Sequence, residues 1–304
     1  MSVNDRAYED FAAAMTEDVG PRVDISGIKN ETDPDKISGV AFELYKEACL
    51  LVGVLAHLLD EQAATDGGWP RNQAICAGLL VRISKLMLVV VQLSAKGDRS
   101  EVVIALSRSI MESAINMEFL VSKNEDKFFD QFVEFSLGPE RELYDLVKTN
   151  VAARGDVVLP IEQRMLSSIE DVCRASRVKI EDVKQKHGDW GGGLRQRLKA
   201  LGREEQYLSI QRIPSHMVHG TWVDLYKNHL KHDTKTDRFN PDSTFSWVDA
   251  RALGPIAVFV LDAASPYVKR YFHDVPQSEL LLQRIDDLQA RIHEVDGAHE
   301  KLMA

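Results

Sequence analysis

Apolar residues recur three and four positions apart along almost the whole chain, which is the spacing of an amphipathic α-helix. Nowhere do two neighbouring runs alternate between apolar and polar residues around an Asn-Gly or Asp-Gly turn, so a β-sheet is not expected. The pattern therefore predicts an all-α protein, an antiparallel helical bundle with extra N- and C-terminal helices. The expected helices cover residues 5–18, 37–64, 73–95, 99–122, 125–151, three shorter stretches between 160 and 201, a helix opening at Pro214, 247–271 and 276–301.

Loops and turn residues divide this helical pattern. A three-residue turn at 96–98 makes the helices on either side antiparallel neighbours, and Gly138-Pro139 is expected to interrupt the stretch 125–151. The polar residues 232–244 are expected to form a loop. The predicted domains are an N-terminal helix and loop (1–36), a single helical bundle domain (37–272) and a C-terminal helix (273–304). That last helix either docks on the bundle or pairs with a second copy as a short coiled coil.

The composition narrows the class of protein. The 304 residues include 37 Lys and Arg against 47 Asp and Glu, a net charge of −10. Such a chain is a poor general binder of polyanions, so a nucleic-acid site would have to be a local basic pocket. Its three cysteines lack Cys-x-x-Cys spacing, which argues against a disulfide framework or a zinc ribbon.

The expected location is the cytoplasm. The amino terminus has no apolar run typical of a signal peptide. The most apolar stretch, residues 74–95, carries Arg82 and Lys85 in its middle. A membrane span needs about 20 nearly uncharged residues, so we interpret this stretch as a buried helix and expect no membrane contact.

Two charged residues lie on an apolar face of the helix 99–122. At about 100° per residue this helix has two nearly opposite apolar stripes, and Arg108 and Glu112 fall within the second, one turn apart. The first stripe contains Val103, Leu106, Ile110, Met117 and Val121, and the second contains Ile104, Ile115 and Phe119. We expect a central helix with a partly buried ion pair. The pair either fixes helix register or presents Arg108, oriented by Glu112, to a phosphate or carboxylate.

The helix opening at Pro214 carries the candidate acid or base. On a helical projection Ser215, His219 and Tyr226 share a face with Trp222, Val223 and Leu230, whereas Asp224, Lys227 and Asn228 point the other way. An inward imidazole beside hydroxyl groups is a candidate proton-transfer group near neutral pH. The alternatives are a satisfied core histidine at 219, a helix-start role for Ser215 and core positions for Trp222 and Tyr226.

Two segments carry a family resemblance. The residues Arg108–Asn116, and Tyr207 followed by Ser215–Gly220, resemble DUF5677, a bacterial all-helical family of unknown function. The resemblance runs from about residue 40 to residue 272. It implies the helical fold and places a site at these two segments, without implying an activity.

A looser similarity is to the HEPN superfamily, helical bundles whose nuclease members carry Arg, four to six residues and then His. Here six residues separate Arg212 from His219. This resemblance implies a metal-independent ribonuclease, often dimeric, in which Arg212 binds the scissile phosphate and His219 is the acid or base. Pro214 lies inside the motif, where a proline favours turning Arg212 away from the His219 face, and Ile213 stands where those nucleases often have a polar residue.

Three functions remain open. The first is an enzyme that acts on RNA or a nucleotide and needs no cofactor. Such an enzyme could form a homodimer. Its catalytic residues would be His219, Arg212 and Ser215, and its substrate-binding residues Arg108, Glu112, Tyr207 and Tyr226. The second is a non-catalytic interaction or regulatory module. The third is a metal site at His216 and His219 or at His229 and His232, which we disfavour because di-metal bundles use Glu-x-x-His pairs that these helices lack.

Overall fold

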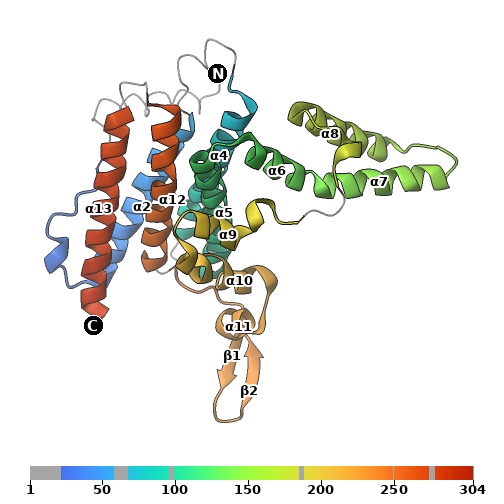
Figure 1. Cartoon of the computed structure of the whole chain (residues 1–304). Helices are drawn as coiled ribbons and strands as arrows, with labels where there is room; N and C mark the ends of the chain where they lie inside the picture. The colour runs from blue at the N-terminus through green and yellow to red at the C-terminus, as the bar shows by residue number, and fades with distance from the viewer. Residues whose placement is uncertain are drawn as a thin grey trace. The chain divides into compact units, whose positions relative to one another are not determined.

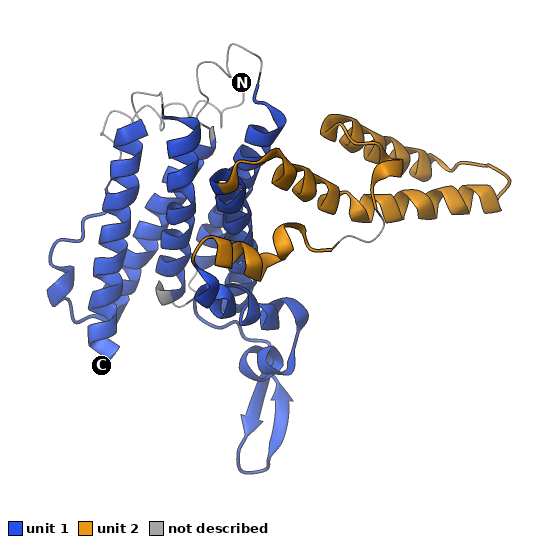
Figure 2. Cartoon of the chain, in the orientation of Figure 1, with its two compact units in different colours: residues 1–122, 203–304 blue, residues 123–202 orange. Residues whose placement is uncertain are grey.

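The computed structural model describes residues 22–57, 68–95, 99–184, 188–248, 250–273 and 278–303. These residues are mostly helical, with one small two-stranded sheet (Figure 1), which confirms the all-α class. The helix expected at 5–18 and the turn expected at 96–98 lie outside the described residues. The chain divides into two compact units, one formed by residues up to Ser122 and from Arg203 onward, the other by Lys123–Gly202 (Figure 2). The predicted domain limits at 36 and 272 stay a prediction.

Apart from the segment after Pro214, which is described below, the helices follow the predicted order with small shifts of their ends. The first unit contains α2 (Pro34–His57), α4 (Arg71–Ser94), α5 (Ser100–Lys123), α10 (Ser215–His219), α11 (Trp222–Asp224), α12 (Ala250–Tyr271) and α13 (Ser278–Met303). Its shorter elements are η1 (Ile28–Asn30), η4 (Glu204–Gln206), the π-helices η5 (Leu208–Arg212) and η6 (Leu225–His229), and the strands β1 (Leu230–Asp233) and β2 (Arg238–Pro241). The second unit contains α6 (Asp126–Ser136), α7 (Gly138–Ala153), α8 (Pro160–Ser176), η2 (Ile180–Asp182), η3 (Trp190–Gly192) and α9 (Leu194–Ala200).

The core of the first unit is a bundle in which α2 packs against α4, α12 and α13 (Figure 1). Helix α2 begins beside Asp33, whose carboxylate accepts a hydrogen bond from the backbone N–H of Asp35 and caps the first turn. The predicted apolar face of α13 is buried at Leu281, Ile285, Leu288 and Ile292. Of the two alternatives for this last helix, the structure therefore shows docking on the bundle.

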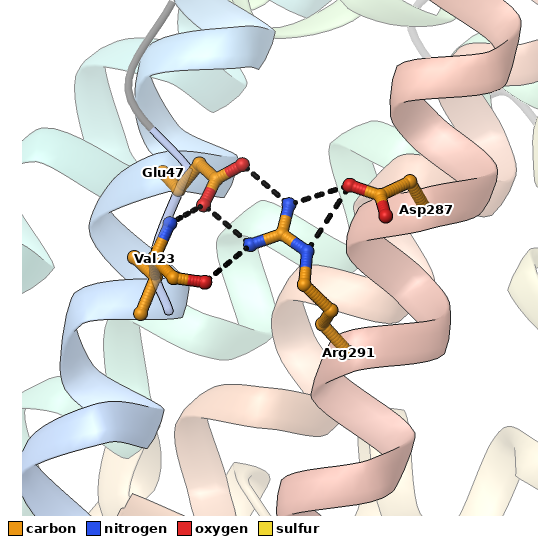
Figure 3. A network of polar contacts seen from close by, with 4 residues as sticks. All are labelled: Val23, Glu47, Asp287 and Arg291. Atoms are coloured by element: carbon orange, nitrogen blue, oxygen red, sulfur yellow. Dashed lines mark hydrogen bonds and ion pairs between the residues drawn. The ribbon is translucent and has the colours of Figure 1, made fainter. Parts of the chain in front are cut away.

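A buried ion network joins α13 to α2 (Figure 3). The Arg291 guanidinium donates to both carboxylate oxygens of Glu47, at 2.7 and 2.6 Å. It also bonds Asp287 and the carbonyl oxygen of Val23, and the Val23 N–H donates to Glu47 at 2.9 Å. Fork-shaped pairing of this kind satisfies most polar atoms of the group, so burial of the charges is compensated by geometry.

Helix α5 is buried on two sides, as its two apolar stripes predict. Val103, Ile110, Met117 and Val121 of one stripe and Ile115 and Phe119 of the other are all buried. Arg82 of α4 donates from Nε to the Ser113 hydroxyl of α5 at 3.1 Å. The expected central position of α5 in its unit agrees with this burial.

The second unit is built from α6 to α9 and its short helical turns. The interruption predicted at Gly138-Pro139 is confirmed, because α6 ends at Ser136 and α7 begins at Gly138. Helix α7 packs on α8. Glu162 accepts the N–H of Leu159 at the start of α8 and is paired with Arg154. These contacts give the unit its own packing.

The prediction of a polar loop at 232–244 is wrong for residues 232–241, because a two-stranded antiparallel hairpin covers residues 230–241. In its register Leu230 lies opposite Pro241, and Asp233 opposite Arg238. The connection is closed by Asp233, whose carboxylate accepts hydrogen bonds from the Lys235 N–H and the Thr236 hydroxyl. The expectation of no sheet rested on the lack of a two-residue Asn-Gly or Asp-Gly turn. This hairpin instead has a longer polar turn that is closed by an aspartate.

Two of the described helices, α4 and residues 252–271 of α12, are long and apolar enough to cross a membrane by length and composition. Core helices of soluble proteins pass the same test. Arg82 and Lys85 of α4 are exposed, whereas most of the apolar window of α12 is buried. This finding assigns no compartment, and the cytoplasmic location stays a prediction.

Candidate functional site

The backbone between Tyr207 and His219 keeps a helical path through a π-helix. The N–H of Ile213 donates to the carbonyl of Leu208, five residues earlier, at 3.0 Å. Ile213 and Pro214 have right-handed helical dihedral angles, and α10 follows directly. The proline therefore does not interrupt the path between Arg212 and His219. Seven residues of helix correspond to about two turns and a rise of about 10 Å.

The long helix predicted from Pro214 is wrong beyond His219. Gly220 adopts φ 57° and ψ 45°, a left-handed conformation that ends α10, and Thr221 is extended. The Thr221 hydroxyl lies 2.7 Å from Nδ1 of His216 and closes the turn. Since the chain changes direction at Gly220, the single apolar face expected over 215–230 does not form. His219 is consequently exposed instead of inward-facing.

The structure separates the predicted Arg108–Glu112 pair. No ion pair joins these two residues in the described part of the chain, and both are half-buried. Arg108 instead donates from Nε to the side-chain oxygen of Gln211, at 3.2 Å. This bond places Arg108 of α5 beside η5, the segment that carries Arg212. Instead of the expected ion pair within α5, Arg108 therefore forms a hydrogen bond that links α5 to η5.

The other predicted site residues lie on or near the same segment. Arg212 and Tyr226 are exposed, and Tyr207 and Ser215 are half-buried. The Ser215 hydroxyl donates to the backbone carbonyl of Gln211. A hydroxyl engaged with the preceding turn agrees with the local structural alternative for Ser215. Its catalytic role stays a prediction.

Four rings from α11, η6 and the two strands of the hairpin form an aromatic cluster, defined here as Trp222, Tyr226, His232 and Phe239. The His232 and Phe239 rings stack at 4.6 Å between centroids, and Trp222 and Tyr226 meet the Phe239 ring at 5.5 and 6.3 Å. Trp222 is 58% exposed, Tyr226 46% and Phe239 41%. A two-stranded hairpin is marginally stable alone, so the cluster supports it. Substantial aromatic surface nevertheless remains open to solvent.

Asp224 lies in a place that the sequence did not predict. It is 4% exposed, although helical projection pointed it towards solvent. It accepts a hydrogen bond from the Asn228 side chain at 2.8 Å and lies 3.5 Å from Nε2 of His229. The π-helix η6 explains the difference, because wider helical turns bring residues five apart onto one side. The buried Asp224 carboxylate is therefore placed to orient the His229 ring.

The imidazoles of this segment have separate partners. His216 contacts Thr221, His229 lies near Asp224, and His232 contacts both Phe239 and Asp237. Within the described ranges no group of three or more His, Cys, Asp or Glu residues is placed to hold a metal ion. The metal alternative therefore receives no support from these residues.

Residues 208–241, which we name the hairpin surface, are locally basic in an acidic chain. They contain five Lys or Arg residues against three Asp residues, one of which is the buried Asp224, while the whole chain has a net charge of −10. They also contain four of its nine histidines. The five cations are Arg212, Lys227, Lys231, Lys235 and Arg238. The basic residues thus lie before and between the residues of the aromatic cluster along the chain.

Comparison with known proteins locates this surface within a family. No curated protein and no solved structure matches the chain. One family does match, over residues 73–237, which is more than half of the chain and includes α5, η5, α10, η6 and β1. The chain belongs to DUF5677, a family of unknown function.

Proposed function

We propose that the chain binds single-stranded RNA through the hairpin surface. The observation that carries this proposal is the exposed aromatic cluster next to basic side chains, in a protein whose charge is otherwise strongly negative. Single-stranded nucleic acids are bound by aromatic rings that stack on bases and by cations that contact phosphates. Both kinds of group are present here on one short stretch of chain.

Electrostatics favours binding at this segment over the rest of the chain. Outside residues 208–241 acidic side chains outnumber basic ones by more than they do in the whole sequence, so phosphates are repelled there. Each phosphate neutralised by Lys or Arg releases counterions, and the affinity therefore falls as salt rises. A steep salt dependence is expected for a site that uses Arg212, Lys227 and Arg238.

The alternative is a non-catalytic interaction module that docks a protein with an acidic surface. Trp, Tyr and Arg are also enriched in the centres of protein interfaces, so the same side chains suit that partner. We favour RNA because Trp222, Tyr226 and Phe239 each expose part of their ring to solvent, and separate exposed rings suit stacking bases better than one continuous flat contact. Binding of RNA by the purified chain discriminates between the two.

The test is fluorescence anisotropy with a labelled 12-nucleotide oligouridine and, for comparison, a 12-base-pair DNA duplex. We expect the RNA to bind more tightly than the duplex, with an affinity that decreases with salt. Trp222→Ala is expected to weaken RNA binding about tenfold, since one stacked base contributes about 1–3 kcal/mol.

Trp247→Ala is the matched control. Trp247 is more exposed than Trp222, and within the described residues its ring makes no contact with the aromatic cluster. Its removal should leave RNA affinity unchanged. Equal loss in both variants, or no RNA binding by the wild type, would contradict the proposal and favour the protein-docking alternative.

A second candidate is metal-independent cleavage of the bound RNA, by similarity to HEPN nucleases. The favouring observation is that Arg212 and His219 are both exposed and are joined by an unbroken helical path through Pro214. His219 would remove the proton of a ribose 2′-hydroxyl, whose oxygen attacks the phosphorus, while Arg212 stabilises the added negative charge. The P–O5′ bond then breaks, giving a 2′,3′-cyclic phosphate and a 5′-hydroxyl that takes up a proton.

Cleavage is tested separately from binding, with labelled RNA in the presence of EDTA. Arg212→Ala and His219→Ala should each abolish cleavage, whereas His216→Ala, on the same short helix, should retain it. An uncleaved substrate in the wild type removes this candidate without affecting the binding proposal. Full activity in both variants also removes it.

A further inference from the structure

A cleft of about 490 Å³ opens in the first unit between α5, residues 206–214, α12 and α13. Its walls are mainly apolar and include Ile104, Ile210, Ile256 and Phe259. Pockets of about 300–1,000 Å³ with apolar walls and a few polar groups are typical of small-molecule sites. This cleft is separate from the aromatic cluster, which contributes no residue to it.

Asp296 is the unusual polar group of the cleft. It comes from α13 and is half-buried. It makes no hydrogen bond or ion pair with any described residue. Burial raises the pKa of its carboxyl, and the neighbouring His293 and His299 oppose that rise. The carboxylate is thus partly removed from water, with only two histidines of the described chain as neighbouring positive groups, and a bound cation would recover the hydration energy that it has lost.

The close packing of α12 holds Asp296 in this position. A Cβ atom added at Gly254 would lie 2.9 Å from Oδ1 of Asp296 and 3.3 Å from a methyl group of Ile292. The carboxylate therefore rests directly against α12 at Gly254, and a larger residue there would displace it. Asp296 also lines the cleft, so its charge can meet a group bound there.

The second carboxylate of the cleft, Asp262, has compensating partners. Gln289 donates to it at 2.7 Å, and Arg203 lies 3.5 Å away while also contacting Glu118 at 3.3 Å. The side-chain oxygen of Gln206, another lining residue, is buried without a hydrogen-bond donor among the described residues. Gln206 thus adds one unsatisfied acceptor to the cleft, while Nη1 of Arg203, next to Asp262, is a buried donor without a partner among the described residues.

We propose that this cleft binds a small amphipathic cation, an apolar molecule that carries one protonated amine. The ammonium group pairs with Asp296, and the apolar body packs against Ile210, Ile256 and Phe259. A neutral apolar ligand would leave the carboxylate uncompensated, and an anion would be repelled by it. The cleft borders the hairpin surface, since Ile210 belongs to residues 208–241, but it uses neither the aromatic cluster nor the cations proposed to bind RNA, so the two proposals are tested independently.

The experiment uses three ligands of one shape, measured by calorimetry and by thermal shift on the whole chain. These are 2-phenylethylamine, 2-phenylethanol and 3-phenylpropanoate. We expect the amine to bind at least tenfold more tightly than the alcohol and to raise the melting temperature, with no detectable binding of the carboxylate. Equal binding of amine and alcohol in the wild type would overturn the proposal without any variant.

Two variants assign the binding to Asp296. Asp296→Asn should reduce amine affinity at least tenfold while leaving the unliganded protein as stable as the wild type or more so, because it removes an uncompensated charge. Glu279→Gln changes an exposed carboxylate near the start of the same helix and should leave affinity unchanged. Wild-type affinity in Asp296→Asn, or an equal loss in Glu279→Gln, would contradict the assignment.

Discussion

The ion network around Arg291 and the hairpin surface differ in how far the fold encloses their charged and aromatic side chains. In the bundle Arg291 is enclosed by Glu47, Asp287 and a backbone carbonyl, and its charge is compensated within the fold. On the hairpin surface Arg212 and Trp222 are exposed. Groups whose bonds are completed within the chain stabilise it, whereas groups left open are available to a partner. From this difference we propose that the first region stabilises the fold and that the second binds a partner.

The largest expected effect belongs to the ion network. Arg291→Met keeps most of the apolar stem but leaves the buried Glu47 without its guanidinium, so we expect a loss of about 3–5 kcal/mol of unfolding free energy. Urea denaturation measures this loss. Lys46→Met breaks an exposed pair with Glu43 on the same helix and should cost less than about 1 kcal/mol. Similar losses in the two variants would remove the distinction between buried and exposed charges.

The second effect depends on pH and concerns Glu118, a buried carboxyl of α5. Burial raises its pKa from the usual 4.5 to about 6, against the lowering effect of Arg203. Because the folded pKa is higher, the folded state holds the proton more tightly. This contribution to stability is complete below pH 4.5 and is lost as pH rises through about 6.

Glu118→Gln tests this titration. Between pH 4.5 and 7 the wild type should lose about 2 kcal/mol that the variant does not lose, since each pKa unit corresponds to about 1.4 kcal/mol. The difference between the two stability curves isolates Glu118 from other titrating groups. Parallel curves would show that Glu118 does not titrate in this range.

The third effect compares one substitution at two glycines. Gly220 has φ 57°, so Gly220→Ala should cost about 1–2 kcal/mol, although nothing lies within 4 Å of the added Cβ. Gly39 lies within helix α2, is exposed and has equally open surroundings. There the same change should stabilise the protein by about 0.5–1 kcal/mol. Thermal unfolding of both variants gives the sign, and equal signs would contradict the left-handed turn after α10.

The smallest effect is expected at Glu112. A structural ion pair with Arg108 would make Glu112→Ala strongly destabilising, but the two residues are not paired. We therefore expect a change within about 0.5 kcal/mol. A loss of 3 kcal/mol in chemical denaturation would restore the paired arrangement that the sequence suggested.

The bundle could be predicted from the sequence because its helices keep a constant period. The buried faces of α5 and α13, and the break before Gly138, follow from residue spacing alone. The hairpin surface could not, because two π-helices and the left-handed Gly220 change the period at each step. Projection at 100° per residue therefore placed His219 inside and Asp224 outside, the reverse of what the structure shows.

Contacts between residues far apart in the chain could not be predicted from the sequence either. Arg108 and Gln211 are 103 residues apart, and Glu47 and Arg291 are 244 apart. Local spacing favours partners one helical turn away, such as Glu112 for Arg108. Tertiary packing decides which carboxylates gain a hydrogen-bonding or ion-pair partner. Local sequence patterns therefore could not predict that Asp296 lacks one among the described residues.

The most direct test of the central claim measures stability and RNA affinity in the same protein, Trp222→Ala. If the hairpin surface is a binding element and the bundle supplies stability, the unfolding free energy should fall by less than about 1 kcal/mol while affinity for oligouridine falls about tenfold. Unchanged RNA affinity, or a large loss of stability that accounts for the weaker binding, would contradict the account.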